Sequence, residues 1–203
     1  MMGERGDFFT PLSCNFHIPQ RPEETHKMQI ETKRLILLEL TESDDDALYR
    51  VLDDSDIRGT RPIRSTKRAS TAGFAATSRA IKYSASACGR SAAKDTGALI
   101  GDCGLTMQRI HGAIRPEIGY HIRRDQRRAG YAAEGAAAVR DWAFRNTPFR
   151  ILYSYMDREN IPSARTAMAY GCQCAETFGE DGRTVCVYAV TRAEWAKKSQ
   201  GES

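Results

Sequence analysis

The chain has 203 residues, of which 41% are hydrophobic and 28% charged, and its formal net charge at pH 7 is +4. This balance is typical of a soluble protein with a real core, and the length suits one domain. No apolar run approaches the roughly 20 residues that a membrane-spanning helix needs, so the sequence excludes a helical membrane protein and predicts no membrane partner.

Residues 1–27 are predicted to be a disordered extension, because acids and prolines interrupt them and they contain no continuous apolar segment. The same features argue against a secretory signal or a transit peptide, so a cytoplasmic location is expected. A single folded domain is expected over 28–198, with 199–203 as a tail. Met28 is a candidate for the native initiator.

The first half of this domain carries mixed patterns. A strand is expected first and a short helix after it, with Thr41 or Ser43 as its cap and acids in its first turn, where the helix dipole favours them. A second helix and a strand with few β-forming residues should follow. The expected ranges of these four elements are 34–40, 44–52, 69–83 and 84–93.

The segment 58–95 is unusual in its composition. Between Arg58 and Lys94 there are nine Lys or Arg residues and no acid, and alanine and serine are frequent. A basic patch of this kind attracts the phosphates of a cofactor or of nucleic acid. We also hypothesise that the segment is translated from a shifted reading frame. An intact coding sequence, shared by close relatives, would contradict that hypothesis.

From residue 96 onward the periodicity is clearer. Strands are expected at 98–106, 114–122, 149–155 and 183–191, and helices at 130–145, 160–171 and 193–198. The first of these helices carries a stripe of small residues, suited to close packing on a sheet, at Ala132, Ala136, Val139 and Ala143. Asn160 should cap the second and Gly171 should end it. The order of elements predicts an α/β protein with a mixed sheet.

The informative stretch is 117–134, EIGYHIRRDQRRAGYAAE, in which an alternating strand leads into a turn that opens a helix. Helix starts leave backbone N–H groups unpaired, and with the helix dipole they form an anion site that suits a pyrophosphate. Gly130 lets the backbone approach a phosphate closely, while Arg127 and Arg128 add positive charge at the rim. By itself the stretch also fits a simple strand–helix turn with solvated arginines.

Three common motifs are missing from the sequence. It has no GxxxxGK[ST], no GxGxxG after the first strand and no GxSxG, so neither a P-loop, a dinucleotide fold nor a hydrolase elbow is indicated. Its six cysteines form no CxxC pair, which predicts reduced thiols and no metal site.

The motif Arg127-x-x-Gly130-x-Ala132 resembles the [QR]-x-x-G-x-[GA] acetyl-CoA motif of GNAT acetyltransferases. The wider text is similar to the RimJ/RimL-like branch of that superfamily, in the family's order and over most of 28–195, at ETKRLILLEL, KDTGALIGDCGL, DRENIPSARTAMAYG and VYAVTRAEW. The resemblance implies the GNAT fold, a mixed and mostly antiparallel seven-stranded sheet that splays and is flanked by helices. It also implies acetyl-CoA as the co-substrate.

Carried over residue by residue, the resemblance implies a cofactor site. In the family, the strand before the motif pairs with the pantetheine arm, the turn amides hold the pyrophosphate, and an asparagine lies on the cofactor side of the last crossover. The corresponding residues here are Tyr120, His121, Ile122, Arg127, Arg128, Ala129, Gly130, Tyr131, Ala132, Asn160 and Arg165. Arg128 and Ala129 stand where this branch often has glycine and lysine.

The resemblance further implies direct attack of an amine on the thioester in a ternary complex. Glu117 is the expected general base, a role that contributes ~10²–10⁴ in rate, and Ser163 the expected donor to the leaving thiolate, because Ala167 replaces the tyrosine of many members. Glu117 could instead be a solvated residue facing Arg115, and Ser163 a helix-terminal hydroxyl that bonds its own backbone. His121 is expected to be a wall residue.

Three functions stay open on the sequence. The first is acetylation of a protein N-terminus, including that of a ribosomal protein, as in the RimJ/RimL-like branch. The second is acetylation of a small-molecule amine such as an antibiotic or a polyamine, against which the basic stretch argues. The third is a non-catalytic acyl-CoA-binding or RNA-binding module, although nucleic acid is not the expected partner. A monomer or a homodimer is expected.

Overall fold

The computed structural model describes residues 29–52 and 87–201. They form one eight-stranded sheet in the order β1-β2-β3-β4-β5-β6-β8-β7. The strands are β1 (Gln29–Glu31), β2 (Leu35–Glu39), β3 (Ala87–Ala93), β4 (Leu99–Ile110), β5 (Ala113–Ile122), β6 (Ile151–Asp157), β7 (Gln173–Glu180) and β8 (Arg183–Thr191). Among the described strands only β5 and β6 pair in parallel, which confirms the predicted mixed and mostly antiparallel α/β sheet.

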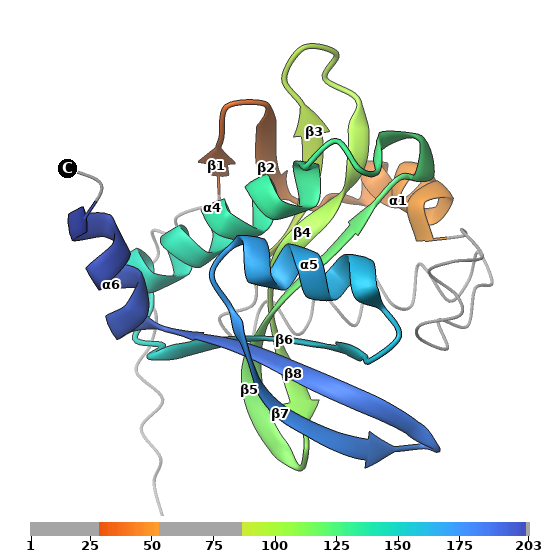
Figure 1. Cartoon of the computed structure of the whole chain (residues 1–203). Helices are drawn as coiled ribbons and strands as arrows, with labels where there is room; N and C mark the ends of the chain where they lie inside the picture. The colour runs from red at the N-terminus through yellow and green to blue at the C-terminus, as the bar shows by residue number, and fades with distance from the viewer. Residues whose placement is uncertain (1–28, 53–86, 202–203) are drawn as a thin grey trace, which may run out of the picture.

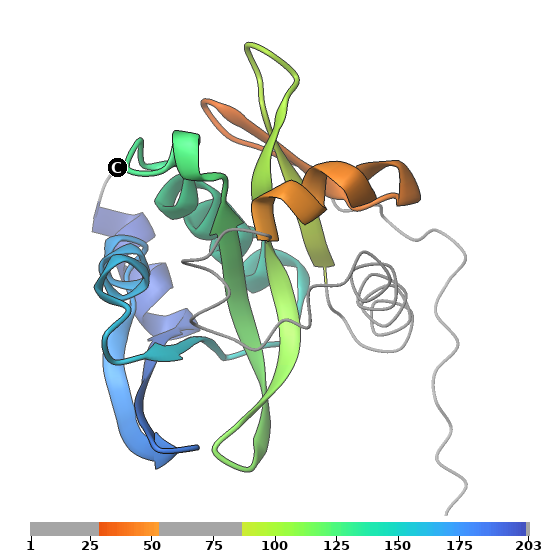
Figure 2. The same cartoon turned by 90° about the vertical axis from the view of Figure 1, so that its right-hand side faces the viewer.

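Helices cover both faces of the sheet (Figures 1 and 2). On one face lie α4 (Tyr131–Asn146) and α5 (Ile161–Ala169), with α6 (Arg192–Gly201) at the end of α4. The other face carries the short 3-10 turn η1 (Glu42–Asp44) and α1 (Asp45–Leu52), which contacts β4 and β5. A second 3-10 turn, η2 (Arg124–Gln126), joins β5 to the start of α4.

The core lies between the sheet and the helices α4 and α5. Small side chains on one face of α4 let the helix approach the sheet closely: Ala136, Val139 and Ala143 are fully buried, as the stripe predicted. A Cβ at Gly135 would already be in contact with the Cys103 sulfur at 3.4 Å, so this helix position suits only a small residue. Leu35 and Leu37 of β2 complete this part of the core.

Most of the predicted elements after residue 95 are confirmed within one or two residues at their ends. Asn160 caps α5, because its Oδ1 accepts from the Ser163 N–H at 3.2 Å, and Gly171 follows α5 with a left-handed φ of 102°. The strand predicted in the alanine-rich and serine-rich text is also present as β3, because β2 and β4 pair with it on both edges.

The sequence patterns predicted six strands and the resemblance implied seven, but the described residues form eight, so two strands were missed. β1 is only three residues long, too short for a period. β7 lies at the sheet edge and none of its residues is buried, so it has no apolar face to reveal it. The dipeptide Asp181-Gly182 could have predicted the β7–β8 hairpin, because Asp-Gly is typical of a two-residue hairpin loop. Both residues have the left-handed backbone conformation that such a loop requires.

Several predictions lie outside the described residues. These are the extension at 1–27, the helix at 69–83, and most of the segment that prompted the reading-frame hypothesis. In the described part, no helix is long and apolar enough to cross a membrane.

Candidate acetyl-CoA site

The parallel strands β5 and β6 separate almost at once. Their backbone pairing has a single register position, Glu117 opposite Tyr153. One residue further on, the Ser154 hydroxyl donates to the Ile118 carbonyl at 2.8 Å, and the Tyr170 hydroxyl lies 2.6 Å from the same Ser154 oxygen. All three residues are at least 98% buried, so a side-chain network closes the sheet where backbone pairing stops.

Beyond this network β5 and β6 are no longer paired, and one edge of β5 faces the place where the two strands part, which we call the β5–β6 opening. Neighbouring residues of a strand direct their backbone groups to opposite edges, and Ile118 directs its carbonyl toward β6. Tyr120 and Ile122 therefore direct theirs to the same side, while β4 pairs with the other edge as far as Ile122. The Arg127 Nε donates to the Ile122 carbonyl at 2.9 Å, which leaves the Tyr120 backbone as the centre of this edge.

The opening leads to the turn that starts α4. Arg128 and Gly130 have left-handed φ values of 65° and 84°. Left-handed residues that alternate with ordinary ones turn consecutive N–H groups toward one side, which makes an anion-binding concavity. Gly130 is the N-cap of α4 and makes no side-chain cap hydrogen bond, so the first N–H groups of this helix are directed into that concavity without a side-chain cap.

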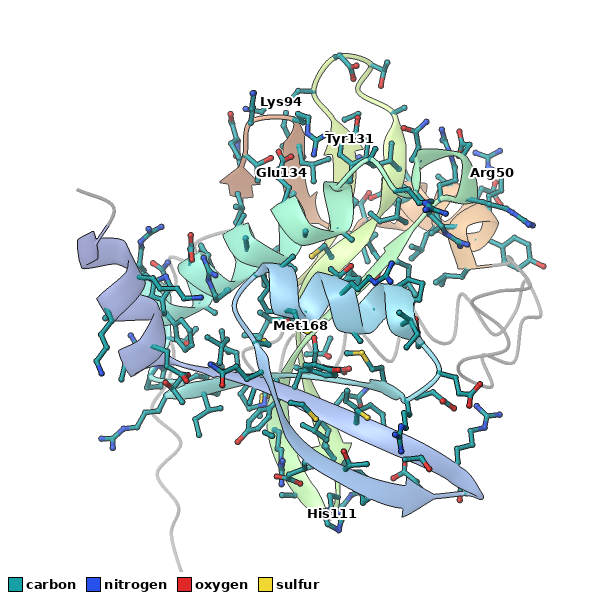
Figure 3. The ribbon with its side chains drawn as sticks, viewed as in Figure 1. Arg50, Lys94, His111, Tyr131, Glu134 and Met168 are labelled. Atoms are coloured by element: carbon teal, nitrogen blue, oxygen red, sulfur yellow. The ribbon has the colours of Figure 1, made fainter. Side chains whose placement is uncertain are left out.

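Side chains on the carbonyl side of this turn hold it in place. Arg34, at the start of β2, donates from Nη1 to the Ala129 carbonyl at 2.8 Å and from Nε to Glu134 at 2.7 Å, and its guanidinium lies 4.4 Å from the Tyr131 ring centre. Tyr131 and Glu134 lie on the first turns of α4, beside the β1–β2 hairpin (Figure 3). Arg34 thus holds the carbonyl side of the turn, and the N–H side faces outward.

Glu134 is the anchor of this layer. It also accepts from the Thr32 hydroxyl at 2.6 Å and from the Arg34 N–H at 2.8 Å. Burial acts to raise the pKa of Glu134, but the hydrogen bonds from Thr32 and Arg34 outweigh it and hold that pKa below its usual value. Glu134 is therefore a carboxylate at neutral pH, close to the α4 N-terminus where the helix dipole stabilises it.

We expect Arg128→Gly to stabilise the protein. A non-glycine residue in the left-handed region costs about 1–2 kcal/mol, and glycine returns only about 0.5–1 kcal/mol of that through backbone entropy. The free energy of unfolding in urea should rise by roughly 0.5–1 kcal/mol. Asp181→Gly is the control, because Asp181 has a φ of 48° but aspartate tolerates it better, so its gain should be smaller. A loss of stability in Arg128→Gly would show that the Arg128 side chain holds the turn.

The helix α5 borders the other side of the opening. The Tyr120 hydroxyl donates to the Ser163 carbonyl at 2.9 Å, and burial raises the pKa of Tyr120 well above its usual value, so this phenol stays neutral. Because Asn160 caps α5, its side chain serves the helix, and the Ser163 hydroxyl is not needed as a cap. Ala167 is fully buried in the core, while Arg165 is exposed.

The predicted site residues thus fall on two faces of the sheet. Tyr120 and Ser163 meet on the α5 face. Glu117 and His121 alternate with Tyr120 along β5 and lie on the α1 face, where Glu117 is 4% exposed and His121 is half-buried. Arg115 pairs with Glu176 at 2.6 Å, which argues against the alternative in which Glu117 is a solvated partner of Arg115.

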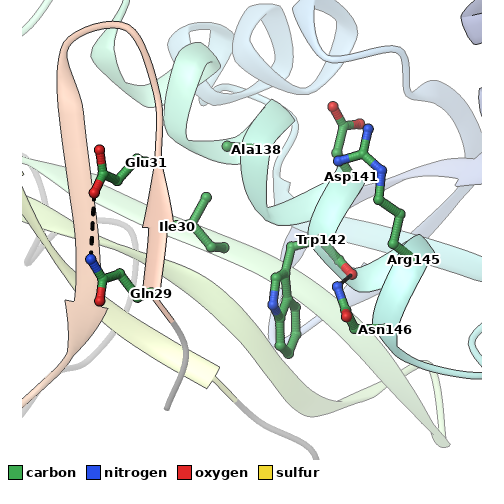
Figure 4. A pocket seen from close by; sticks show the side chains of 8 residues that line it. All are labelled: Gln29, Ile30, Glu31, Ala138, Asp141, Trp142, Arg145 and Asn146. Atoms are coloured by element: carbon green, nitrogen blue, oxygen red, sulfur yellow. Dashed lines mark hydrogen bonds between the residues drawn. The ribbon is translucent and has the colours of Figure 1, made fainter. Parts of the chain in front are cut away.

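A shallow depression lies elsewhere, between β1 and α4 (Figure 4). Its walls include Ile30, Trp142 and Arg145, and Asn146 donates to the Trp142 carbonyl at 2.8 Å. It lies along the C-terminal half of α4, far along the helix from Gly130. In the described part of the chain, no group of three His, Cys, Asp or Glu side chains could hold a metal ion.

Comparison with known proteins identifies the family. A sequence family described as an acetyltransferase (GNAT) domain matches residues 34–173, more than half of the chain. The chain belongs to the GNAT acetyltransferase family. Its matched region contains the β5–β6 opening, the turn and α5, and the family match agrees with the fold expected from the sequence.

Individual relatives are more distant. YkkB of Bacillus subtilis, an uncharacterized protein, is 33% identical over 95 residues, which are 47% of this chain and 55% of YkkB, so the chain spans about half the length of this curated relative. An acetyltransferase structure from Agrobacterium tumefaciens has a TM-score of 0.68 at 22% identity, covering 93% of this chain and 99% of that one. RimL, a ribosomal-protein alpha-N-acetyltransferase in complex with coenzyme A, has a TM-score of 0.69 at 13% identity, covering 81% and 98%.

Sequence reasoning missed the residues that support the site through hydrogen bonds to its backbone and side chains. Arg34 and Thr32 lie in the quoted segment ETKRLILLEL, yet no local pattern assigns a role to them. Ser154 and Tyr170 were not singled out, because a serine in a strand and a tyrosine after a helix carry no motif. Only their meeting across β6 and α5 makes them a unit.

Proposed function

We propose that this GNAT protein transfers an acetyl group from acetyl-CoA to a primary amine, by direct attack of the amine on the thioester. The observation that carries the proposal is the β5–β6 opening, which leads from the Ser154–Tyr170 network to the left-handed turn at Arg128 and Gly130. An open strand edge suits the amide groups of a pantetheine arm, and the helix start suits its pyrophosphate.

The proposed role of each residue follows from the face of the sheet on which it lies. The backbone of Tyr120 would pair with the pantetheine arm, and the amides from Arg128 to Ala132 would hold the pyrophosphate. Ser163, on α5, would give a proton to the leaving thiolate. Glu117, on the opposite face of β5, would take a proton from the amine, which therefore approaches from the α1 side.

For the acceptor, we propose the α-amine of a protein N-terminus. RimL, whose fold this chain shares, is named as an enzyme that acetylates such an amine on a ribosomal protein. An α-amine has a reference pKa of ~7.7–8.0 against ~10.4 for lysine, so it needs less help to reach the reactive, unprotonated form at neutral pH.

Release of coenzyme A, followed with a thiol reagent, tests the proposal. With acetyl-CoA present, a short peptide with a free α-amine should release thiol, and the same peptide with a blocked N-terminus should not. If spermidine causes thiol release and neither peptide does, the small-molecule alternative is favoured. If the protein binds acetyl-CoA but no amine releases thiol, the acetyltransfer proposal is wrong.

A further inference from the structure

We infer that His121, oriented by Asp102, is a second proton acceptor for the amine and acts together with Glu117. This inference rests on the proposed function. It is carried by a pair of side chains on β4 and β5 whose contact no local pattern in the sequence indicates.

The pair has a defined geometry. Asp102 and His121 lie opposite each other in the β4–β5 register, and His121 Nδ1 is 3.1 Å from both carboxylate oxygens of Asp102. A carboxylate only accepts hydrogen bonds, so Nδ1 carries the proton that is shared with Asp102. In the neutral ring Nε2 is then the basic atom, which is the tautomer that a general base requires.

Asp102 lies between Arg90 and His121 in a row of residues across three strands. In the β3–β4 register Arg90 lies opposite Asp102, so Arg90, Asp102 and His121 form a cross-strand row on one face of the sheet. Arg90 also donates from Nη1 to Asp44 at 3.0 Å. The side chain of Asp102 is 10% exposed and that of His121 is 30% exposed, so the carboxylate is buried and the ring is accessible from the surface.

The space beside the ring suits an amine. Glu117, Gly119 and His121 occupy successive positions on the same face of β5, and a Cβ built at Gly119 would meet no atom of the described residues within 4 Å. Glu117 is 4% exposed, so His121 is the more accessible of the two groups. Other described charged or titratable residues on the elements that border this face include Asp46, Tyr49 and Arg50 of α1, Arg115 of β5, and Tyr153, Tyr155 and Asp157 of β6.

Proton balance gives the two groups distinct tasks. An ammonium group has three N–H bonds and the amide product has one, so two must break. In the first step His121 Nε2 takes one proton, and the free amine attacks the thioester carbonyl. As the C–N bond forms and the C–S bond breaks, Glu117 takes the second proton and the thiolate gains one from Ser163. Ser163 is reprotonated from the Glu117 proton through solvent, so one proton in total is released.

The test compares His121→Gln, Asp102→Asn and the double variant in the thiol-release assay with the α-amine peptide. We expect kcat/KM for the peptide to fall about 10²–10⁴-fold in His121→Gln, and its dependence on pH to change shape. In Asp102→Asn kcat/KM should fall by a smaller factor. The double variant should have the same kcat/KM as His121→Gln, because the effects of substituting residues that act as a unit are not additive. The dissociation constant for acetyl-CoA, from calorimetry, should be unchanged in all three.

His111→Gln is the matched control. His111 lies at the β4–β5 turn, at the far end of the hairpin (Figure 3), where it stacks on Phe178 with ring centres 4.3 Å apart. Its kcat/KM should equal that of the unchanged protein. If His121→Gln has the same kcat/KM as the unchanged protein, the inference is wrong. It is also wrong if His121→Gln loses only affinity for acetyl-CoA, because His121 would then be a wall residue of the cofactor site. If the unchanged protein binds acetyl-CoA but acetylates no amine, the proposed function itself fails.

Discussion

Replacement of Gly130 by valine should strongly weaken acetyl-CoA binding. Gly130 has a φ of 84°, a conformation that a β-branched residue adopts only under strain. Its Cβ would also lie 3.3 Å from Arg34 Nη2, so the guanidinium that holds the Ala129 carbonyl would have to shift by a few tenths of an ångström. We expect the dissociation constant from calorimetry to rise at least about 100-fold, which corresponds to roughly 2.7 kcal/mol.

Gly182→Val separates backbone strain from loss of the site. Gly182 has a φ of 75°, and a Cβ added there would meet no atom within 4 Å in the described part of the chain, so the valine carries the same strain outside the site. It should lose about 1–2 kcal/mol of stability and keep its acetyl-CoA affinity. If Gly130→Val is folded by circular dichroism and binds acetyl-CoA as tightly as Gly182→Val, the turn at 128–130 is not the pyrophosphate site.

Ser154→Ala should cause a large loss of stability for a change of one oxygen atom. It leaves two buried groups without their partner, the Ile118 carbonyl and the Tyr170 hydroxyl. An unsatisfied buried group costs about 1–3 kcal/mol, and the Tyr170 hydroxyl keeps a weak contact with the Cys172 thiol, so the free energy of unfolding in urea should fall by roughly 2–4 kcal/mol. Because the network closes the sheet where β5 and β6 part, acetyl-CoA affinity should fall as well.

Two further variants test the cause of that loss. Adding Tyr170→Phe to Ser154→Ala removes one of the unsatisfied groups, so the double variant should be more stable than Ser154→Ala by about 1 kcal/mol or more. Ser91→Ala is the matched control, because Ser91 is 1% exposed and its hydroxyl has no hydrogen-bond partner among the described residues. Its stability should not fall. A Ser154→Ala protein as stable as Ser91→Ala would contradict the role of the network.

The sequence alone determined the local structure around the turn and the family resemblance. Alternation in β5 and the small-residue stripe in α4 are periodic over many residues, and Gly130, Asn160 and Gly171 mark positions where local backbone geometry restricts the choice of residue. These patterns depend only on neighbours along the chain. For that reason the strand, the turn, the helix and its cap were placed correctly without a structure.

The tertiary structure alone decided how the site is held and where its side chains meet. Arg34 lies 95 residues before Ala129, Ser154 lies 36 residues after Ile118, and Asp102 lies 19 residues before His121. Such pairs depend on strand order, register and the face to which each side chain points, and no local period encodes them. The edge strand β7 was missed for a related reason: hydrogen bonds to β8 hold it in the sheet, and it buries no apolar face.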